Sequence, residues 1–412
     1  MSNTSSGTQK AIIFWLSGAE LAPIRTLPEV ETLLKQGAMV ELEASPIVEP
    51  LSQNYQTLSG RLPEHFGFFD SLMPRNYAIV EQASGRGETP KLLPDLLRTV
   101  GWTVKYEEAQ LSNLVAQVQA WTESTLTSPS CLLVKCKVQR HFEGVDLSAI
   151  AQALRLAQAS VERAGLLAVL SDTRPATVER FVNVNNFLAE MGVIELDEQS
   201  GEVNWRNSLA YYAGHGQLWV NLLGRDSQGA VHPQDEYEEV RETLVKTLPT
   251  KLRDSKTGTP VIERVYRKEE VYSGEYLFCA PDLVVVFRPG FVPSPNSTRM
   301  EFDDATFTTP ITGATVKAGG HPSTFRGFLL ISGPSIQAGV TVPEQAPLSA
   351  TTPTLLHALG VEYVDVDSPA VSALFSPSYL ESHPIRSGSR NQELSEEDEE
   401  LIISHLRDLG YV

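Results

Sequence analysis

Polar side chains capable of chemistry stand at the ends of several short apolar runs in this sequence. They are Ser17, Arg140, His141, Asp172, Thr173, Arg174 and His321. In a parallel α/β sheet, ligands bind outside the carboxyl ends of the strands, so side chains that follow different strands can meet at one edge. We therefore expect a serine, two histidines, an aspartate and several cations to converge there. Imidazole and carboxylate groups bind metal ions, and guanidinium groups bind anions.

The apolar runs that carry these residues are typical of buried strands, and helical patterns lie between them. Strands are expected at 11–16, 131–138, 166–172, 218–224, 281–287 and 327–333. Helices are expected at 28–37, with Gly37 as the cap, and at 147–165, 235–248 and 352–361. Because the strands are apolar on both faces and alternate with helices, we predict a mainly parallel sheet with helices on both faces.

The composition excludes several classes of protein. The 412 residues carry 33 basic and 51 acidic side chains, which gives a formal net charge of −18. A surface this acidic repels phosphate, which argues against nucleic acid and anionic membranes as partners. With 42% hydrophobic residues the chain can bury a core. Its length predicts two or three domains, or one large α/β domain with an insert.

Cysteine usage and hydropathy indicate the compartment. Cys131, Cys136 and Cys279 include no CxxC pair and imply no disulfide framework, which favours reduced thiols. No apolar stretch approaches the roughly 18 residues of a membrane span, and the run at 11–16 is too short for a signal-peptide core. We therefore expect a soluble, cytoplasmic protein without a membrane span.

Six segments, taken in order, resemble one enzyme family. LSDTRPATVERFVNVNNFLAEMGVIEL (170–196) resembles a family segment that begins SDHGF and ends NVNRWLREEGLL. WVNLLGRDSQGAV (219–231) is similar to VNLKGREPEGIV, and GGHPSTFRGFLLISGPSIQAG (319–339) is similar to GDH-x-PDGIFIASGPGIKKG. Residues 257–287, 350–361 and the C-terminal end complete the series. The chain thus resembles the alkaline phosphatase superfamily, in the branch of type I phosphodiesterases and nucleotide pyrophosphatases.

The resemblance implies a three-layer α/β sandwich, in which a mostly parallel sheet has helices on both faces and a small cap-like insert. We expect a disordered tail over 1–10 and the first part of the core over 11–190. A cap-like and sheet-edge region with some core elements is expected over 191–320. The last part of the core, over 321–412, is expected to end in an acidic helix capped by Ser395. Compared with the family, residues 71–130 look trimmed.

The family needs two divalent ions, which bridge the phosphoryl oxygens, and a hydroxyl nucleophile that one ion activates. Its carboxylate and imidazole ligands suit zinc or manganese. Carried over residue by residue, the metal-ligand positions fall on Ser17, Lys137, His141, Asp172, Thr173 and His321. The nucleophile falls near Pro50, in a count made back from LSGRLPEHFGFFD (58–70), and Ser52 is the nearest, weak substitute.

The site implied by the resemblance is therefore degenerate. Only His141, Asp172 and His321 keep the ligand types, and they are weak candidates for a metal site that has lost most of its negative charge. We expect no catalytic residue, metal or cofactor. We hypothesise that Lys137 pairs with Asp172 in place of a metal ion, because a buried carboxylate needs a neutralising partner.

Three functions follow from this interpretation. The first is a catalytically inactive homologue that binds a partner protein or a small anionic ligand, with Lys137, Arg140 and Arg174 as the anion-binding residues. The second is a hydrolase of phosphate or sulfate esters with a rebuilt site that uses zinc or manganese. The third is a structural subunit of an assembly. Among the other histidines, His215 is the best placed to reach a cleft, because it lies in a glycine-rich turn before a strand.

Overall fold

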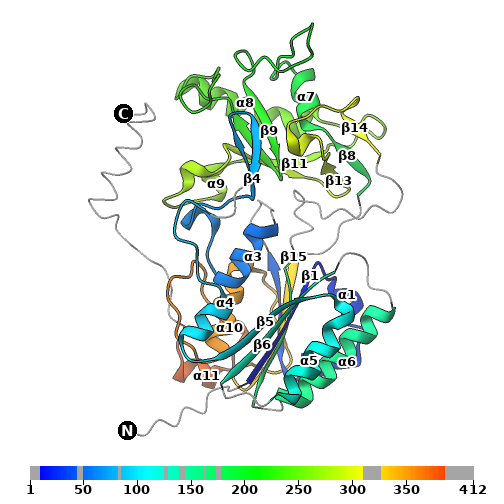
Figure 1. The fold of residues 1–412 in the computed structure, drawn as a ribbon, viewed down its shortest axis with the longest axis vertical. Helices are drawn as coiled ribbons and strands as arrows, with labels where there is room; N and C mark the ends of the chain where they lie inside the picture. Colours follow the sequence, from blue (N-terminus) through cyan, green and yellow to red (C-terminus); the bar gives the residue numbers. More distant parts are fainter. Residues whose placement is uncertain are drawn as a thin grey trace, which may run out of the picture.

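A computed structural model describes residues 10–43, 50–81, 85–124, 129–138, 144–161, 164–172, 178–309 and 326–385. Figure 1 shows two units along the long axis of the molecule, a core around one large sheet and a cap that contains smaller sheets. Of the site residues expected from the sequence, Ser17, Ser52, Lys137 and Asp172 lie within the described residues, as does the backbone of Pro50. Arg140, His141, Thr173, Arg174 and His321 lie outside them, as do residues 1–9 and the expected helix after Ser395.

The core sheet has the strand order β16-β2-β15-β7-β1-β6-β5, and β17 also pairs with β2. Its strands are β1 (Lys10–Ser17), β2 (Ala38–Glu43), β5 (Thr103–Ala109), β6 (Ser130–Lys137), β7 (Leu166–Ser171), β15 (Arg326–Ser332), β16 (Val340–Thr341) and β17 (Ala346–Pro347). Neighbours among β7, β1, β6 and β5 run parallel. Only β15 is antiparallel to both of its neighbours. The prediction of a mostly parallel sheet is confirmed.

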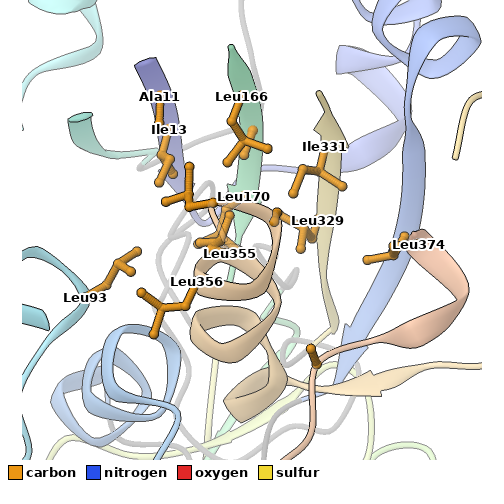
Figure 2. Packing of buried hydrophobic residues seen from close by; sticks show 14 of the residues in the cluster. Ala11, Ile13, Leu93, Leu166, Leu170, Leu329, Ile331, Leu355, Leu356 and Leu374 are labelled. Atoms are coloured by element: carbon orange, nitrogen blue, oxygen red, sulfur yellow. The ribbon is translucent and has the colours of Figure 1, made fainter. Parts of the chain in front are cut away.

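Helices cover both faces of this sheet (Figure 1). Those on one face are α3 (Pro50–Ser59), α4 (Leu93–Thr99) and α10 (Thr351–Ala358), and those on the other are α2 (Pro28–Gln36), α5 (Leu114–Glu123) and α6 (Gly144–Val161). Alternation along β1 divides the core, because odd-numbered side chains such as Ile13 join the first group and even-numbered ones such as Phe14 join the second. Figure 2 shows Leu355 and Leu356 of α10 packed under Ile13 and Leu170.

Helix α2 ends at Gln36, directly before Gly37, as expected. The reason is close packing, since Gly37 has an extended backbone with φ −141°. A Cβ atom at this position would lie 2.1 Å from the carbonyl oxygen of Ile331 in β15. Glycine therefore allows the chain to enter β2 directly against its antiparallel neighbour.

The cap is built around an antiparallel sheet with the order β11-β12-β10-β9. These strands are β9 (Ala210–Gly214), β10 (Gln217–Val220), β11 (Ile262–Arg267) and β12 (Leu283–Phe287), and α8 (Asp235–Lys251) packs against β11. A second sheet has the order β13-β8-β14, formed by β13 (Phe291–Pro293), β8 (Arg180–Val182) and β14 (Phe307–Thr308). The runs at 218–224 and 281–287 thus do contain strands, but these belong to the cap and are antiparallel.

Packing extends the cap beyond the expected residues 191–320. Strand β8 and helix α7 (Val184–Glu190) share one hydrophobic cluster with the antiparallel cap sheet. The hairpin of β3 (Leu72–Arg75) and β4 (Ala78–Glu81) also packs into this cluster, although it comes from the first part of the chain. The region that looked trimmed therefore holds a contact between core and cap. No helix among the described residues is long and apolar enough to cross a membrane.

Candidate functional site

The carboxyl ends of β7, β1 and β6 lie side by side and bring three of the expected residues to one edge. Ser17 ends β1, Lys137 ends β6, and Asp172 directly follows β7. Ser17 is in register with Lys137. By alternation, all three belong to the sheet face that α3, α4 and α10 cover. The edge formed by the carboxyl ends of these three strands is therefore the candidate site.

Ser17 and Asp172 interact directly. The Ser17 hydroxyl donates a hydrogen bond to Asp172 Oδ2 at 3.2 Å, and both residues are buried. The Ser17 carbonyl accepts a hydrogen bond from the backbone N–H of Val138, at 2.7 Å, which fixes the end of β1 against β6. Two positions that we expected to correspond to metal ligands thus hold a hydroxyl and a carboxylate joined by a hydrogen bond.

A buried lysine that we did not single out in the sequence lies on the same face. Lys135 of β6 has a side chain only 3% exposed, and its Nζ donates to Asn54 Oδ1 of α3 at 2.9 Å. The ammonium lies 3.6 Å from Glu108 Oε1 and 4.2 Å from the centre of the Trp15 ring. Burial lowers the pKa of Lys135, and the negative charges of Asp172 and Glu108 oppose that shift.

Lys137 differs from Lys135 in its surroundings. Its side chain is exposed at the end of β6, and its positive charge contributes to lowering the pKa of Lys135. The edge therefore carries two ammonium groups near one buried carboxylate. The clue in the sequence was a lysine inside an apolar run, two residues before Lys137 and hence on the same face of the strand.

The position where we expected the nucleophile lies at the beginning of a helix. Pro50 is the first residue of α3, and proline has no hydroxyl group. Ser52 is fully buried, and its hydroxyl donates to the carbonyl oxygen of Phe68 at 3.5 Å. The nearest alcohol is thus part of the interior packing between α3 and the segment that follows it.

The residues described at this edge do not fit a divalent metal ion. Ser17, Lys137 and Asp172 supply one hydroxyl, one ammonium and one carboxylate, and the hydroxyl proton points to the carboxylate. An ammonium repels a cation, and zinc or manganese needs several anionic or imidazole ligands. Across the described residues, no three His, Cys, Asp or Glu side chains gather where they could hold a metal.

His215 lies at the contact between core and cap. It occupies the turn between β9 and β10 with a φ of +45°, a conformation uncommon for residues other than glycine. Its Nδ1 is 2.8 Å from Oδ2 of Asp70, a fully buried carboxylate that also accepts a hydrogen bond from the amide of Gln217. This imidazole therefore joins the cap to the segment that leaves the core.

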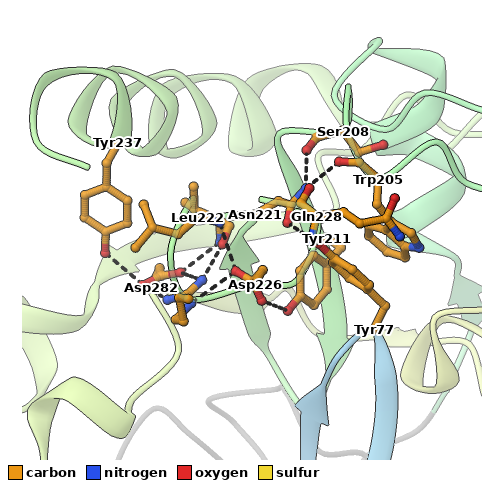
Figure 3. Close-up of polar contacts among 12 residues, drawn as sticks. Tyr77, Trp205, Ser208, Tyr211, Asn221, Leu222, Asp226, Gln228, Tyr237 and Asp282 are labelled. Atoms are coloured by element: carbon orange, nitrogen blue, oxygen red, sulfur yellow. Dashed lines mark hydrogen bonds and ion pairs between the residues drawn. The ribbon is translucent and has the colours of Figure 1, made fainter. Parts of the chain in front are cut away.

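A larger polar network lies inside the cap (Figure 3). Asp282 is fully buried. Its carboxylate accepts hydrogen bonds from both terminal nitrogens of Arg225 and from the hydroxyl of Tyr237. Burial alone would raise the pKa of Asp282, but the positive charges of Arg225 and Lys268 hold it below its usual value. Every contact drawn joins elements of the cap or the hairpin, so the network pairs these buried charges within the cap.

Solved structures match this chain, whereas no protein-family model and no curated protein does. Human ectonucleotide pyrophosphatase/phosphodiesterase 5 matches with a TM-score of 0.54 and 14% identity, over 92% of this chain and 100% of that chain. The murine protein matches with a TM-score of 0.56 and 12% identity, over 90% and 100%. An inactive murine variant in complex with AMP gives 0.55 and 12%, over 92% and 100%.

Identities this low show a shared fold and leave the chemistry to the residues themselves. The match extends over nearly the whole chain, core and cap together. It agrees with the mixed sheet, its helical layers and the inserted cap described above. This protein therefore has the fold of the nucleotide pyrophosphatases/phosphodiesterases that it matches.

Proposed function

We propose that this protein is a catalytically inactive homologue of nucleotide pyrophosphatases/phosphodiesterases and acts as a binding or interaction protein. The hydrogen bond from Ser17 to Asp172 is the observation that carries the proposal. It occupies one oxygen of the carboxylate with a hydroxyl donor, at a position where the resemblance to these enzymes implies a metal ligand. The fold and the ordered sequence resemblance support the relationship.

The nucleophile position supports the same conclusion. Phosphoryl transfer by way of a covalent intermediate needs a hydroxyl that a neighbouring metal ion activates. Pro50 cannot supply one, and the hydroxyl of Ser52 donates to a buried carbonyl oxygen. A residue two positions further along the helix is also turned by about 200° around the helix axis. Neither residue is suited to attack phosphorus at this edge.

The charge at the edge favours a small anionic ligand. Lys135 and Lys137 bring two ammonium groups to the described part of the site, and Arg140 and Arg174 follow two of the same strands in the sequence. AMP is the natural first probe, since an inactive variant of a protein with this fold was solved in complex with it. The ligand would be bound without being cleaved.

Metal analysis and turnover test the proposal on the purified full chain. We expect less than about 0.1 equivalent of zinc or manganese by elemental analysis. We also expect no hydrolysis of bis(4-nitrophenyl) phosphate above the protein-free rate when either metal is added. Stoichiometric metal together with turnover would establish the rebuilt hydrolase instead.

A thermal-shift titration with AMP in the presence of a chelator tests the binding role. Ligand binding to the folded state raises the melting temperature in a saturable way. A shift with AMP supports the small-ligand form of the proposal. The absence of a shift, combined with a stoichiometric protein partner after purification, would favour the interaction role or a structural subunit.

A cytoplasmic location is part of the proposal. Cys131, Cys136 and Cys279 are all free thiols. Burial raises the pKa of Cys131 to about 12 and that of Cys136 to about 11, which keeps both protonated and unreactive. Reduced, buried thiols are compatible with a reducing compartment.

A further inference from the structure

The chain passes from core to cap through residues 61–70, which we call the junction segment. It begins one residue beyond the end of α3, after Gly60, and ends before β3. Near its end, Phe69 packs edge-on against Tyr272 of the cap with ring centroids 5.0 Å apart, and Asp70 contacts His215. The segment is therefore both a covalent connection and a packed interface between the two units.

Residues 273–276 of the cap, which we call the cap loop, rest on the middle of the junction segment. The N–H of Tyr276 donates to the carbonyl oxygen of Glu64 at 3.1 Å, and the N–H of Ser273 donates to the Glu64 carboxyl group. Gly274 has a φ of +124°, and a Cβ atom there would lie 2.6 Å from Cδ2 of His65. The cap loop thus fits closely over two neighbouring titratable side chains.

Glu64 is a buried acid with incomplete hydrogen bonding. The residue is 3% exposed, and its Oε2 is buried without a hydrogen-bond partner among the described residues. A carboxylate in such a place is costly, whereas a neutral carboxylic acid is tolerated. Burial accordingly raises the pKa of Glu64 to about 7.

One edge of the His65 ring faces the cap loop, and its Nδ1 contacts Asp367 in the loop after α10. Oδ2 of Asp367 is 2.8 Å from His65 Nδ1, and it also accepts from Arg61 Nε at 3.2 Å and from the N–H of Leu62 at 2.7 Å. The hydrogen bond to Asp367 raises the pKa of His65. Burial would raise the pKa of Asp367, but His65 and its other donors hold that pKa below its usual value.

The charged groups that act on Glu64 come from two sides. His65 from its own segment lowers the pKa of Glu64, and Asp367 from the loop after α10 raises it, while Arg61 acts on the same cluster through Asp367. The cap loop contributes two backbone N–H donors, that of Tyr276 to the Glu64 carbonyl oxygen and that of Ser273 to its carboxyl group. The side chain of Glu275, also in the cap loop, is exposed.

We propose that Glu64 and His65 form a proton-dependent latch, which holds the cap loop on the junction segment when both are protonated and weakens this contact when both have lost their protons. With both protons bound, Glu64 is neutral and His65 is a cation paired with Asp367. Loss of both protons leaves a buried carboxylate beside Asp367 and a neutral imidazole. The local charge then falls by two units, and the interface becomes anionic.

The sign of the pH dependence follows from the two raised pKa values. Glu64 stabilises the closed junction fully below its usual pKa of 4.5, and this contribution is lost as the pH rises to about 7. The contribution of His65 is complete below its usual value of 6.5 and is lost above it. Asp367, whose pKa is lowered, contributes fully above its usual pKa of 3.8 and loses this contribution only at lower pH. The latch therefore loosens as the pH rises from 4.5 to about 7 through Glu64, and further above 6.5 through His65.

Hydrogen exchange across this pH range tests the latch in the full chain. After correction for intrinsic exchange, the opening constant of peptides that cover 61–70 and 270–280 should rise about tenfold or more from pH 5.0 to 8.0. The exchange of α8, within the cap, is the internal reference. The Glu64→Gln variant mimics the protonated acid, so its opening constant should stay flat up to about pH 6 and rise only with loss of the proton from His65.

Two outcomes would overturn the latch. One is junction exchange in the unmodified chain that does not depend on pH, a result that is decisive even if the variant fails to fold. The other is the same pH profile in Glu64→Gln as in the unmodified chain. The matched control is Glu263→Gln, an exposed glutamate of β11, which should keep the unmodified profile.

Discussion

At the scale of single residues, the site depends on how buried charges are satisfied. Asp172 accepts a hydrogen bond from the hydroxyl of Ser17. The ammonium of Lys135 in β6, two strands away from β7 in the sheet, adds a positive charge nearby. Lys135 itself is held by Asn54 and lies over Trp15. The hydroxyl of Ser17 thus supplies a hydrogen bond to Asp172, and Lys135 supplies a neighbouring positive charge. Each of these interactions can be removed by a single substitution.

Lys135→Met should lower the free energy of unfolding by about 1–3 kcal/mol, because Asn54 loses its donor and Asp172 loses a neighbouring cation. Urea denaturation at neutral pH measures the change. Lys137→Met is the matched control, since its side chain is exposed and its loss should cost less than about 0.5 kcal/mol. Equal effects of the two substitutions would contradict a special role for the buried lysine.

Ser17→Asp should lower the melting temperature, because it places a second carboxylate within hydrogen-bonding distance of Asp172. Added zinc should not restore the loss, since ammonium groups occupy the same edge. Differential scanning fluorimetry with and without zinc gives the result, and a saturable rise with zinc would show that a metal site can form. Ser17→Ala, which loses only the hydrogen bond, should cost about 1 kcal/mol.

At the scale of elements, β15 fixes the distance between β2 and the strands of the site. Gly327 begins its buried part, and a Cβ atom there would lie 1.9 Å from the carbonyl oxygen of Ser171 in β7. Since Asp172 directly follows Ser171, strain at this point would act on the site. The glycine is needed for close approach of two backbones.

Gly327→Ala should therefore destabilise the fold by about 3 kcal/mol, because β7 and β15 must separate to admit the methyl group. Chemical denaturation measures this loss. Arg326→Ala, on the exposed neighbouring residue, should change stability by less than about 0.5 kcal/mol. A Gly327 variant as stable as the control would show that the two strands can adjust freely.

At the scale of the whole molecule, a hairpin from the core half of the sequence is built into the cap. Tyr77 stacks on Trp205 with ring centroids 3.9 Å apart, and its hydroxyl donates to Asn221 Oδ1 at 2.8 Å and accepts from the N–H of Gln228 at 3.0 Å (Figure 3). Together with the junction segment, this contact couples the two units mechanically.

Tyr77→Ala should loosen the hairpin by about 2–3 kcal/mol, because both the stacking and the hydrogen bonds are lost. Hydrogen exchange of residues 72–81 should accelerate, while the core strand β1 stays protected. Tyr77→Phe keeps the stacking and should lose only about 1 kcal/mol. Unchanged exchange of the hairpin in the alanine variant would mean that other contacts hold it.

The sequence by itself determined most of the local structure, and it is also the source of the expectation that the site is degenerate. Apolar runs and helical patterns predicted β1, β6, β7, α2, α6 and α8. These patterns can be recognised because the periodicity of apolar residues depends only on residues that are close in the sequence. The prediction that Pro50 lies near the nucleophile position, and Lys137 at a ligand position, came from the resemblance alone. The family resemblance itself was readable in the sequence, because its segments keep their order along the chain.

Only the tertiary structure decided which strands pair and which side chains meet. The runs at 218–224 and 281–287 have the same apolar character as β7, yet they pair antiparallel in the cap. Periodicity reports which faces are buried and carries no information about the partner. The hydrogen bond from Ser17 to Asp172, the position of Lys135 under α3 and the buried Glu64 arise between distant segments. Their energies depend on distance and desolvation, and the folded chain alone sets both.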